Sequence, residues 1–263
     1  MELAVRERLI LDSLLEKGAI SVAGLSRDLS VSEVTIRSDL NNLEKKGLLN
    51  RVHGGAVPSV HPHILERQNL RLEEKHSIAR AAAALINDGD TIMIEAGTTP
   101  ALLCRYLGGK RDVHVITNSV LAFIAAKNNP ALKITLCGGE FRSNTESFIG
   151  PIAEETVRRF NVRFAFIGTD GFCAEGGLTT HLVEGAEVIK VMKEKARETI
   201  VLVDSSKYGR AGPVTFMPLS GADLIITDSE ISPRAATEMK ADSRIRGIEE
   251  EHDAAVTRFK LIK

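Results

Sequence analysis

Five short polar segments of this chain have the residue types that bind a charged small molecule. Each follows an apolar run, and in the first of them Gly97, Thr98 and Thr99 precede a proline at which a helix can begin. The backbone N–H groups of such a turn, together with two hydroxyl groups, favour an anion. The candidate contact residues in these segments are Glu95, Gly97, Thr98, Thr99, Asn118, Ser119, Gly138, Gly139, Arg142, Asp170, Gly171 and Lys207.

The chemistry of these segments suits an anion and sugar hydroxyl groups. Lys207 and Arg142 supply positive charge, whereas Asp170 and Asn118 can hydrogen-bond sugar hydroxyl groups. A single Gly-Thr-Thr turn is more often a plain helix cap, so only the five segments together indicate a site. The alternative is an enzyme in which Asp170, Glu187 and Lys207 pass a proton across an enediolate.

A second group of polar side chains, near the N-terminus, has the spacing of a DNA-reading helix. Ile36, Leu40 and Leu43 form the apolar face of a helix that Ser32 caps and that runs to about Lys46. The other side carries hydroxyl, amide and basic groups, which can contact base edges and phosphates in a major groove. The candidate DNA contacts are Ser32, Thr35, Arg37, Ser38, Asn41, Asn42, Lys45, Arg51 and His53.

The elements that must position this helix form a winged helix-turn-helix. An apolar stripe that ends at Gly18 predicts a first helix, and residues 22–29 predict a second. Gly47 closes the third helix, and residues 48–57 predict a two-stranded wing with a Gly54-Gly55 turn. The alternative is a three-helix bundle that serves only for protein contacts.

The other polar segments belong to an α/β region. A helix over residues 74–86 precedes short apolar runs that mostly alternate with helical stretches. This pattern indicates a mostly parallel sheet covered by helices, whose ligands bind beyond the carboxyl ends of the strands. The predicted strands cover residues 91–94, 113–117, 134–137, 164–168, 199–204 and 224–227.

The chain therefore divides into a DNA-binding domain over residues 1–57, a linker over residues 58–72 and an effector-binding domain over residues 73–263. Pro58 and Pro62 are expected to break regular structure in the linker. The tail beyond residue 241 is highly charged and shows no pattern that we can interpret.

Composition excludes several classes of protein. The 263 residues are 43% hydrophobic and 26% charged, which is typical of a globular protein. The longest apolar run, residues 120–126, is about a third of the length that crossing a bilayer requires, so we expect no membrane association. Three widely spaced cysteines indicate a reducing compartment, and we expect a cytoplasmic protein without a cofactor. His61 and His63 have no third ligand nearby, so we expect no metal.

The net charge of the chain provides little electrostatic attraction to DNA. The whole chain carries −1, and residues 1–57 balance eight Lys or Arg against eight Asp or Glu. Residues 37–53 retain a local charge of +2, from four basic and two acidic side chains. A patch this small favours a dimer or tetramer, in which paired modules bind paired half-sites.

Two stretches carry a close family resemblance. Residues 31–40 (VSEVTIRSDL) and 43–56 (LEKKGLLNRVHGGA) resemble the DeoR family of sugar-metabolism repressors. Residues 73–207 resemble the sensor domain of that family, which is similar in fold to ribose-5-phosphate isomerase. The resemblance implies a regulator rather than an enzyme, with a double-stranded DNA operator as its target. It also implies a phosphorylated sugar or sugar-alcohol effector that changes DNA affinity.

Two positions depart from the family pattern. Ser38 stands where the family usually has Arg, so one cationic contact with DNA is missing. Glu95 stands where the family commonly has Asp, which leaves its role open. Residues 168–172 and 177–187 look most like the galactitol and related hexitol or amino-sugar branch.

Overall fold

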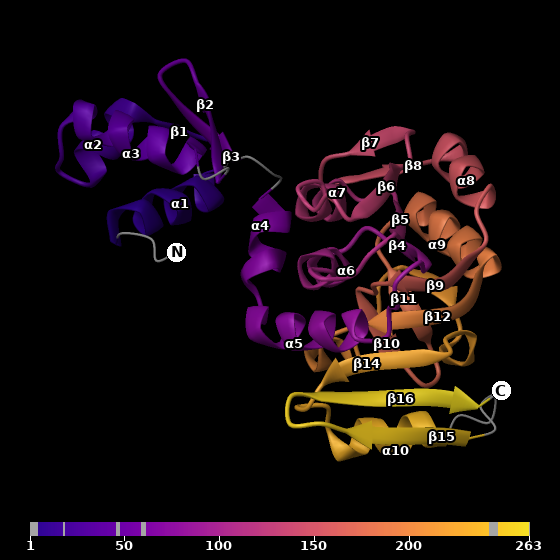
Figure 1. Cartoon of the computed structure of the whole chain (residues 1–263). Helices are drawn as coiled ribbons and strands as arrows, with labels where there is room; N and C mark the ends of the chain where they lie inside the picture. Colours follow the sequence, from indigo (N-terminus) through magenta and orange to yellow (C-terminus); the bar gives the residue numbers. More distant parts are fainter. Residues whose placement is uncertain (1–4, 18, 46–47, 59–61, 242–246, 263) are drawn as a thin grey trace. The chain divides into compact units, whose positions relative to one another are not determined.

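The computed structural model describes residues 5–17, 19–45, 48–58, 62–241 and 247–262. It divides the chain into two compact units, Met1–Leu70 and Arg71–Lys263, which are described separately below (Figure 1). Within the described ranges, none of the helices combines the length and apolar character needed to cross a bilayer.

The first unit is a winged helix-turn-helix, as the sequence predicts. Its buried core joins the three helices to the wing through side chains such as Ile10, Leu14 and Leu49. The predicted helix ends at Gly18 and Gly47 lie outside the described residues. The elements are α1 (Val5–Lys17), β1 (Ile20–Ser21), α2 (Val22–Asp28), α3 (Glu33–Lys45), β2 (Leu49–Val52) and β3 (Gly55–Pro58).

The wing contains a third, very short strand that the sequence did not predict. The strand order is β1-β3-β2, with Ile20 opposite Ala56 and Ser21 opposite Gly55. A Cβ atom on Gly55 would lie 2.0 Å from the Ile20 carbonyl oxygen, so this close pairing requires glycine. The prediction of a Gly54-Gly55 turn is wrong, because the turn residues are His53 and Gly54 and Gly55 already belongs to β3.

The expectation that Pro62 breaks regular structure is wrong, because a helix begins at this residue. Helix α4 covers Pro62–Asn69, and α5 (Leu72–Ala83) begins two residues before the predicted helix start at residue 74. A proline is compatible with the first position of a helix, because its missing N–H would have no intrahelical partner there. Residues 59–61, which include His61, lie outside the described ranges.

The second unit is built around an eight-stranded sheet whose order is β15-β16-β14-β12-β9-β4-β5-β6. The six strands from β14 to β6 pair in parallel, and they confirm the six predicted strands with shifts of a few residues at their ends. The parallel strands are β4 (Thr91–Ile94), β5 (Val113–Thr117), β6 (Leu132–Leu136), β9 (Val162–Ile167), β12 (Ala196–Leu202) and β14 (Leu224–Asp228).

The charged tail contributes the other two strands of this sheet. Strand β16 (Val256–Ile262) pairs antiparallel with β14, and β15 (Gly247–His252) pairs antiparallel with β16. The apolar side chains of β16 alternate with polar ones, and Phe259 and Leu261 enter the core.

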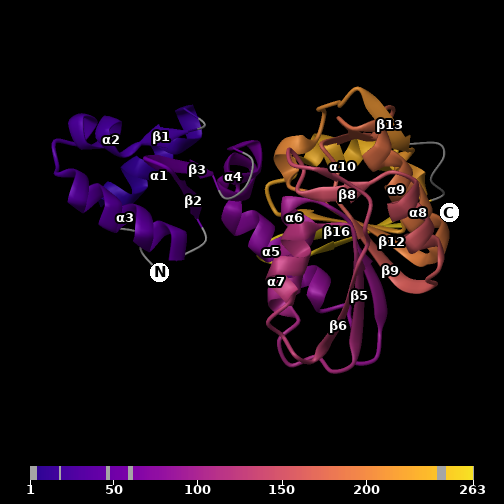
Figure 2. The same ribbon diagram turned by 90° about the horizontal axis from the view of Figure 1, so that it is seen from above.

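Helices cover both faces of the sheet (Figures 1 and 2). One face carries α5, α6 (Thr98–Leu103) and α7 (Val120–Ala126), which pack against one another in sequence. The opposite face buries Met93, Ile116 and Ala165 in a core shared with the other three helices. Those helices are α8 (Pro151–Arg158), α9 (Val183–Lys195) and α10 (Pro233–Lys240).

The strand order reverses its direction of growth between β4 and β9. From β4 the chain first builds outward to β5 and β6, and then returns to the other side of β4 to add β9, β12 and β14. Such a reversal leaves a crevice beyond the carboxyl ends of β4 and β9, where open α/β sheets bind ligands.

Small elements follow three of these strand ends along the chain. The hairpin β7 (Glu140–Arg142) and β8 (Ser147–Ile149) follows β6, and η2 (Ser205–Lys207) follows β12. The antiparallel sheet β10-β11-β13 consists of Gly171–Cys173, Gly177–Thr180 and Val214–Met217, and its first two strands follow β9.

Candidate DNA-binding surface and effector site

Helix α3 presents its polar side to solvent. Ile36, Leu40 and Leu43 are fully buried, and Ser38 is exposed on the opposite side, so the predicted helical phase is correct. Asp39 is buried, and its carboxylate accepts hydrogen bonds from the Arg6 guanidinium at 2.5 and 3.1 Å. The exposed side chains of the helix include Val34, Arg37, Ser38, Asn42 and Lys45, while Thr35 and Asn41 are partly exposed.

Two predicted DNA contacts also cap the helix. The Ser32 hydroxyl accepts a hydrogen bond from the Thr35 backbone N–H at 3.2 Å, as predicted for an N-cap. The two hydroxyl oxygens lie 2.9 Å apart and hydrogen-bond to each other. A cap of this kind stabilises a helix by about 1 kcal/mol, so Ser32 has a structural role whether or not it meets a phosphate.

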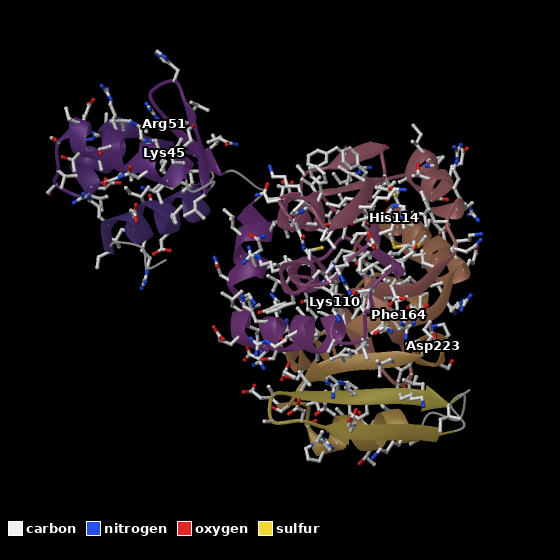
Figure 3. The ribbon with its side chains drawn as sticks, viewed as in Figure 1. Lys45, Arg51, Lys110, His114, Phe164 and Asp223 are labelled. Atoms are coloured by element: carbon white, nitrogen blue, oxygen red, sulfur yellow. The ribbon has the colours of Figure 1, made fainter. Side chains whose placement is uncertain are left out.

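Two basic side chains of this surface have partners within the protein. Arg37 pairs with Glu33 at 2.9 Å, and the Arg51 guanidinium donates a hydrogen bond to the Asn41 side-chain oxygen. The Arg51 backbone N–H donates to Glu44 at 2.9 Å, which ties β2 to the end of α3. Figure 3 labels Arg51 and Lys45 in this unit. Because these pairs are exposed, exchanging their carboxylate or amide partners for a phosphate costs little. His53 is exposed in the wing turn.

The second candidate site lies at the crevice between β4 and β9. Glu95 follows β4, and its buried carboxylate accepts a hydrogen bond from the Gly168 N–H at 3.0 Å. The Glu95 backbone N–H donates to the Phe166 carbonyl at 2.9 Å. Glu95 therefore joins the ends of the two strands that border the crevice.

Asn118 and Ser119 follow β5, and their polar groups hold neighbouring loops. The Asn118 side-chain oxygen accepts from the Ala96 N–H, and its amide nitrogen donates to the Phe148 carbonyl, both at 3.1 Å. The Ser119 hydroxyl accepts from the Ala122 N–H at 3.2 Å and caps α7. Both side chains are buried, so they support the crevice from below.

Close backbone packing explains two of the predicted glycines. A Cβ atom would lie 2.5 Å from the Ile149 carbonyl oxygen at Gly139, and 2.2 Å from the Arg210 carbonyl oxygen at Gly171. Gly138 has open space around its Cα atom. Gly97 is extended and precedes Thr98 and Thr99, which begin α6 and are both buried.

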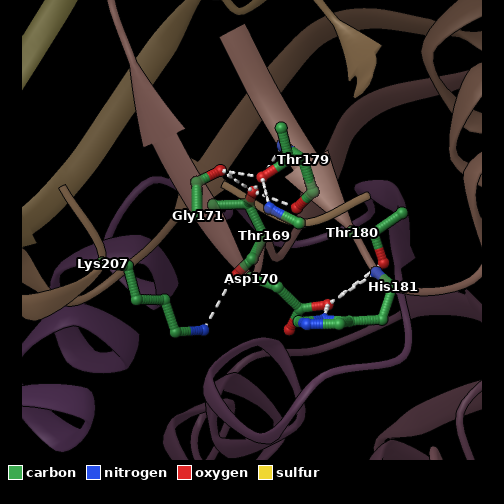
Figure 4. Close-up of polar contacts among 8 residues, drawn as sticks. Thr169, Asp170, Gly171, Thr179, Thr180, His181 and Lys207 are labelled. Carbon is green, nitrogen blue, oxygen red and sulfur yellow. Dashed lines mark hydrogen bonds and ion pairs between the residues drawn. The ribbon is translucent and has the colours of Figure 1, made fainter. Parts of the chain in front are cut away.

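The loops after β9 and β12 meet at Lys207 (Figure 4). The Lys207 ammonium donates a hydrogen bond to the Thr169 carbonyl oxygen at 2.6 Å. The neighbouring Asp170 carboxylate accepts from the Thr180 hydroxyl and the His181 N–H, each at 3.2 Å. The same carboxylate lies 2.9 Å from His181 Nδ1. A cation, a carboxylate and an exposed imidazole therefore lie next to the crevice.

Sequence reasoning did not select His181 or the acidic residues that support η2. His181 follows β11, a four-residue strand that the sequence pattern did not predict. Asp228 accepts a hydrogen bond from the Ser205 N–H at 2.7 Å, and Asp204 accepts one from the Ser206 hydroxyl. Both aspartates are almost completely buried at strand ends. A buried acidic residue at the end of an apolar strand was the available signal.

The ion pairs of Arg142 are with other residues than those of the cluster around Lys207. Arg142 pairs with Glu140 at 3.3 Å and with Glu184 of α9 at 3.1 Å, so carboxylates offset its charge. Glu187, the third residue of the alternative proton-transfer site, pairs with Lys190 of its own helix at 2.7 Å. Within the described ranges, no three His, Cys, Asp or Glu side chains gather as a metal site.

Both units match known families. Residues 6–60 match the DeoR-like helix-turn-helix domain, and residues 70–229 match the DeoR C terminal sensor domain. A putative aga operon transcriptional repressor of Escherichia coli O157:H7 is 33% identical over 232 residues, which cover 86% of each chain. The lactose phosphotransferase system repressor of Lactococcus lactis subsp. lactis is 35% identical over 233 residues, 86% of this chain and 91% of that protein.

The likeness to solved structures is weaker. A D-ribose-5-phosphate isomerase in complex with phospho-erythronic acid aligns with a TM-score of 0.40 and 17% identity, covering 72% of this chain and 79% of that chain. The fold assignment therefore rests on the strand order of this chain and on the family matches.

Proposed function

Because this chain belongs to the DeoR family of transcriptional regulators, we propose that it represses a carbohydrate-utilisation operon under the control of a phosphorylated sugar or sugar alcohol. The chain is a DNA-binding regulator with a sensor domain, and its relatives are regulators rather than enzymes. The observation that carries the proposal is the pairing, in one chain, of an exposed polar face on α3 with a polar crevice at the strand reversal.

We propose that α3 enters the major groove and that the wing contacts the backbone. Arg37, Ser38 and Asn42 are the exposed groups that can reach base edges, whereas Arg51 suits a phosphate. In gel-shift titrations, Arg37→Ala should cost roughly 1–3 kcal/mol and relax one operator position. Arg51→Ala should weaken all duplexes alike and flatten the salt dependence. Unchanged affinity in both variants would contradict this surface.

The operator complex should contain a dimer or tetramer. One module with a local charge of +2 has few phosphate contacts, and a two-fold axis doubles them. The half-sites, found by selection from a random duplex pool, should lie about one helical turn apart or a multiple of it. Sedimentation that finds only a monomer, with and without the selected duplex, would rule this out.

For the effector, we propose a phosphate near Thr98, Thr99 and Lys207, with sugar hydroxyl groups at Asp170. The two threonines are buried at the start of α6, and Lys207 is held at the next strand end by Thr169. Hydrogen bonds that involve charged groups are about twice as strong as neutral ones, so a phosphate should bind much better than the free sugar.

The test is a thermal-shift screen of the full chain. The panel contains galactitol 1-phosphate, D-fructose 1-phosphate, N-acetyl-D-galactosamine 6-phosphate and glycerol 3-phosphate, each beside its dephosphorylated form. At 100 times its Kd, a ligand should stabilise the folded state by about 2.7 kcal/mol. Equal shifts from a sugar phosphate and its free sugar would mean that the phosphate makes no contact.

A further inference from the structure

Arg71 occupies an unusual backbone position at the boundary between the two units. It is the first residue of the second unit and directly follows Leu70, the last residue of the first. Its φ of 54° and ψ of 44° lie in the left-handed region, which only a few per cent of non-glycine residues adopt. Its side chain makes no cap hydrogen bond to α5. Contacts elsewhere must therefore hold this conformation.

Those contacts come from the guanidinium of Arg71, which is largely buried. A single terminal nitrogen lies within hydrogen-bonding or ion-pair distance of four side chains. Three of these side chains are carboxylates: one lies in α5, one is the last residue of β14 and one follows β14. The partners are Glu230 at 2.6 Å, Glu74 at 3.2 Å, Asp228 at 3.3 Å and the Ser205 hydroxyl at 3.4 Å.

Asp228 connects Arg71 to the loop that carries Lys207. One Asp228 oxygen faces Arg71, and the other accepts the Ser205 N–H at 2.7 Å. Ser205 begins the one-turn helix η2, which ends at Lys207. The Lys207 ammonium in turn holds the Thr169 carbonyl. An unbroken series of polar contacts thus runs from the unit boundary to the crevice.

We propose that Arg71 transmits the state of the effector site to the DNA-binding unit through Asp228, which rests on the proposed role of Lys207 in binding the effector. A phosphate that draws Lys207 away from Thr169 moves η2, and with it the Ser205 groups that Asp228 and Arg71 hold. Arg71 then changes its contacts at the residue from which the chain continues into the DNA-binding unit. The coupling is reciprocal, so DNA binding should change the affinity for the effector by the same factor.

Arg71 is a positioning residue in this proposal, and its test must separate coupling from a local role in starting α5. A local role predicts that changes at Arg71 affect only the first turn of α5. Coupling predicts that changes at either end of the contact series reach the other end. The Ser205 N–H, bonded to Asp228, and the Lys75 N–H, bonded to the Arg71 carbonyl at 3.1 Å, report on the two ends.

The first experiment needs no ligand and follows amide hydrogen exchange in the full chain by NMR. Arg71→Asn removes the guanidinium and keeps a residue that tolerates the left-handed region. We expect this variant to speed exchange at Ser205, and Asp228→Asn to speed exchange at Lys75, each by about tenfold or more. Lys207→Ala should speed exchange at Lys75 in the wild-type background but not in the Arg71→Asn background. Such non-additivity marks coupled sites.

The matched control is Arg111→Gln, which removes an exposed ion pair with Asp88 at 3.0 Å. It should leave exchange at both reporter amides unchanged. If Arg71→Asn alters exchange only within α5, the proposal is overturned. If Arg71→Asn unfolds the second unit, Arg71→Lys and Asp228→Asn repeat the comparison with smaller changes.

The second experiment measures operator affinity with and without the member of the sugar-phosphate panel that most stabilises the wild type. Coupling in regulators typically changes affinity by about 5- to 150-fold. In Arg71→Asn, the operator Kd without ligand and the Kd for the sugar phosphate should each stay within about threefold of the wild-type values. The ratio of the operator Kd with ligand to that without ligand should fall close to one. A variant that responds like the wild type would refute the proposal. If no panel member binds the wild type, the proposed effector fails, and the exchange experiment still decides the role of Arg71.

Discussion

At the scale of single residues, Ser38 stands where the family usually has arginine, and this difference bears directly on DNA binding. Its side chain is exposed on α3 beside Arg37 and Asn42, so a longer side chain there meets no protein atoms of the core. Ser38→Arg should raise the affinity for non-specific duplexes and steepen its dependence on salt by about one phosphate contact. A salt titration measures the slope, and Ser38→Ala is the matched control with no added charge. A large loss of thermal stability in the arginine variant, without a gain in affinity, would contradict the exposed position of this side chain.

The three cysteines should differ sharply in reactivity. Burial raises the pKa of Cys104 to about 12 and that of Cys137 to about 11, because a buried thiolate loses its hydration. Cys173 is partly exposed. Iodoacetamide at pH 8 should therefore modify one thiol per native chain and three after unfolding in guanidinium chloride. Cys173→Ser should have no rapidly reacting thiol, and two fast thiols in the wild type would contradict the burial of Cys104 and Cys137.

The polar residues of the crevice show which features of a site can be predicted from residue types at strand ends. The position of Glu95, Asn118 and Lys207 at one edge of the sheet could be predicted, because each follows a parallel strand. Their roles depended on contacts between residues far apart in sequence. Asn118 supports two loops, Arg142 faces carboxylates, and His181 reaches Asp170 from the residue after β11.

At the scale of elements, the wing depends on one glycine. Gly55→Ala would place a Cβ atom 2.0 Å from the Ile20 carbonyl oxygen, so β1 and β3 must separate. Overpacking of this kind typically costs about 1–3 kcal/mol, and the wing should lose its position for DNA. Thermal melting and gel-shift titration measure the two effects. Gly108→Ala, where a Cβ atom has open space, is the control. A Gly55→Ala variant with wild-type melting and DNA affinity would mean that this close approach is absent.

Element length decided which parts of the fold could be predicted. The six parallel strands are apolar because both faces of the sheet are covered by helices, and each left a clear run. Strands such as β1, β7 and β10 have two or three residues, which is too few for a periodic pattern. In the charged tail, β15 is mostly acidic and only the middle of β16 alternates apolar and charged residues, so neither strand has a clear pattern. The pairing of β16 with β14 joins segments that are far apart in the sequence.

At the scale of the whole molecule, the two functions should be separable by mutation. Thr98→Val with Lys207→Ala removes a hydroxyl group and a charge from the crevice, and neither residue belongs to the DNA-binding unit. The double variant should bind the operator as the wild type does without ligand, but should no longer respond to a sugar phosphate. A ligand changes the equilibrium only by its differential affinity for the two states. Gel shifts with and without the phosphate provide the measurement, and a retained response would place the phosphate elsewhere.

The edge hairpin of the second unit bears on how the protein resists aggregation. Strand β16 covers the edge of β14, whose Ile225 and Ile226 are buried, and β15 then becomes the outer strand with three consecutive glutamates. Charged outer strands discourage edge-to-edge pairing between copies, whereas an uncovered apolar strand invites it. Truncation after residue 241 would expose the edge of β14 and remove the core side chains Phe259 and Leu261, so we expect the shortened chain to self-associate. We therefore expect the charged hairpin to prevent pairing between the sheet edges of two copies.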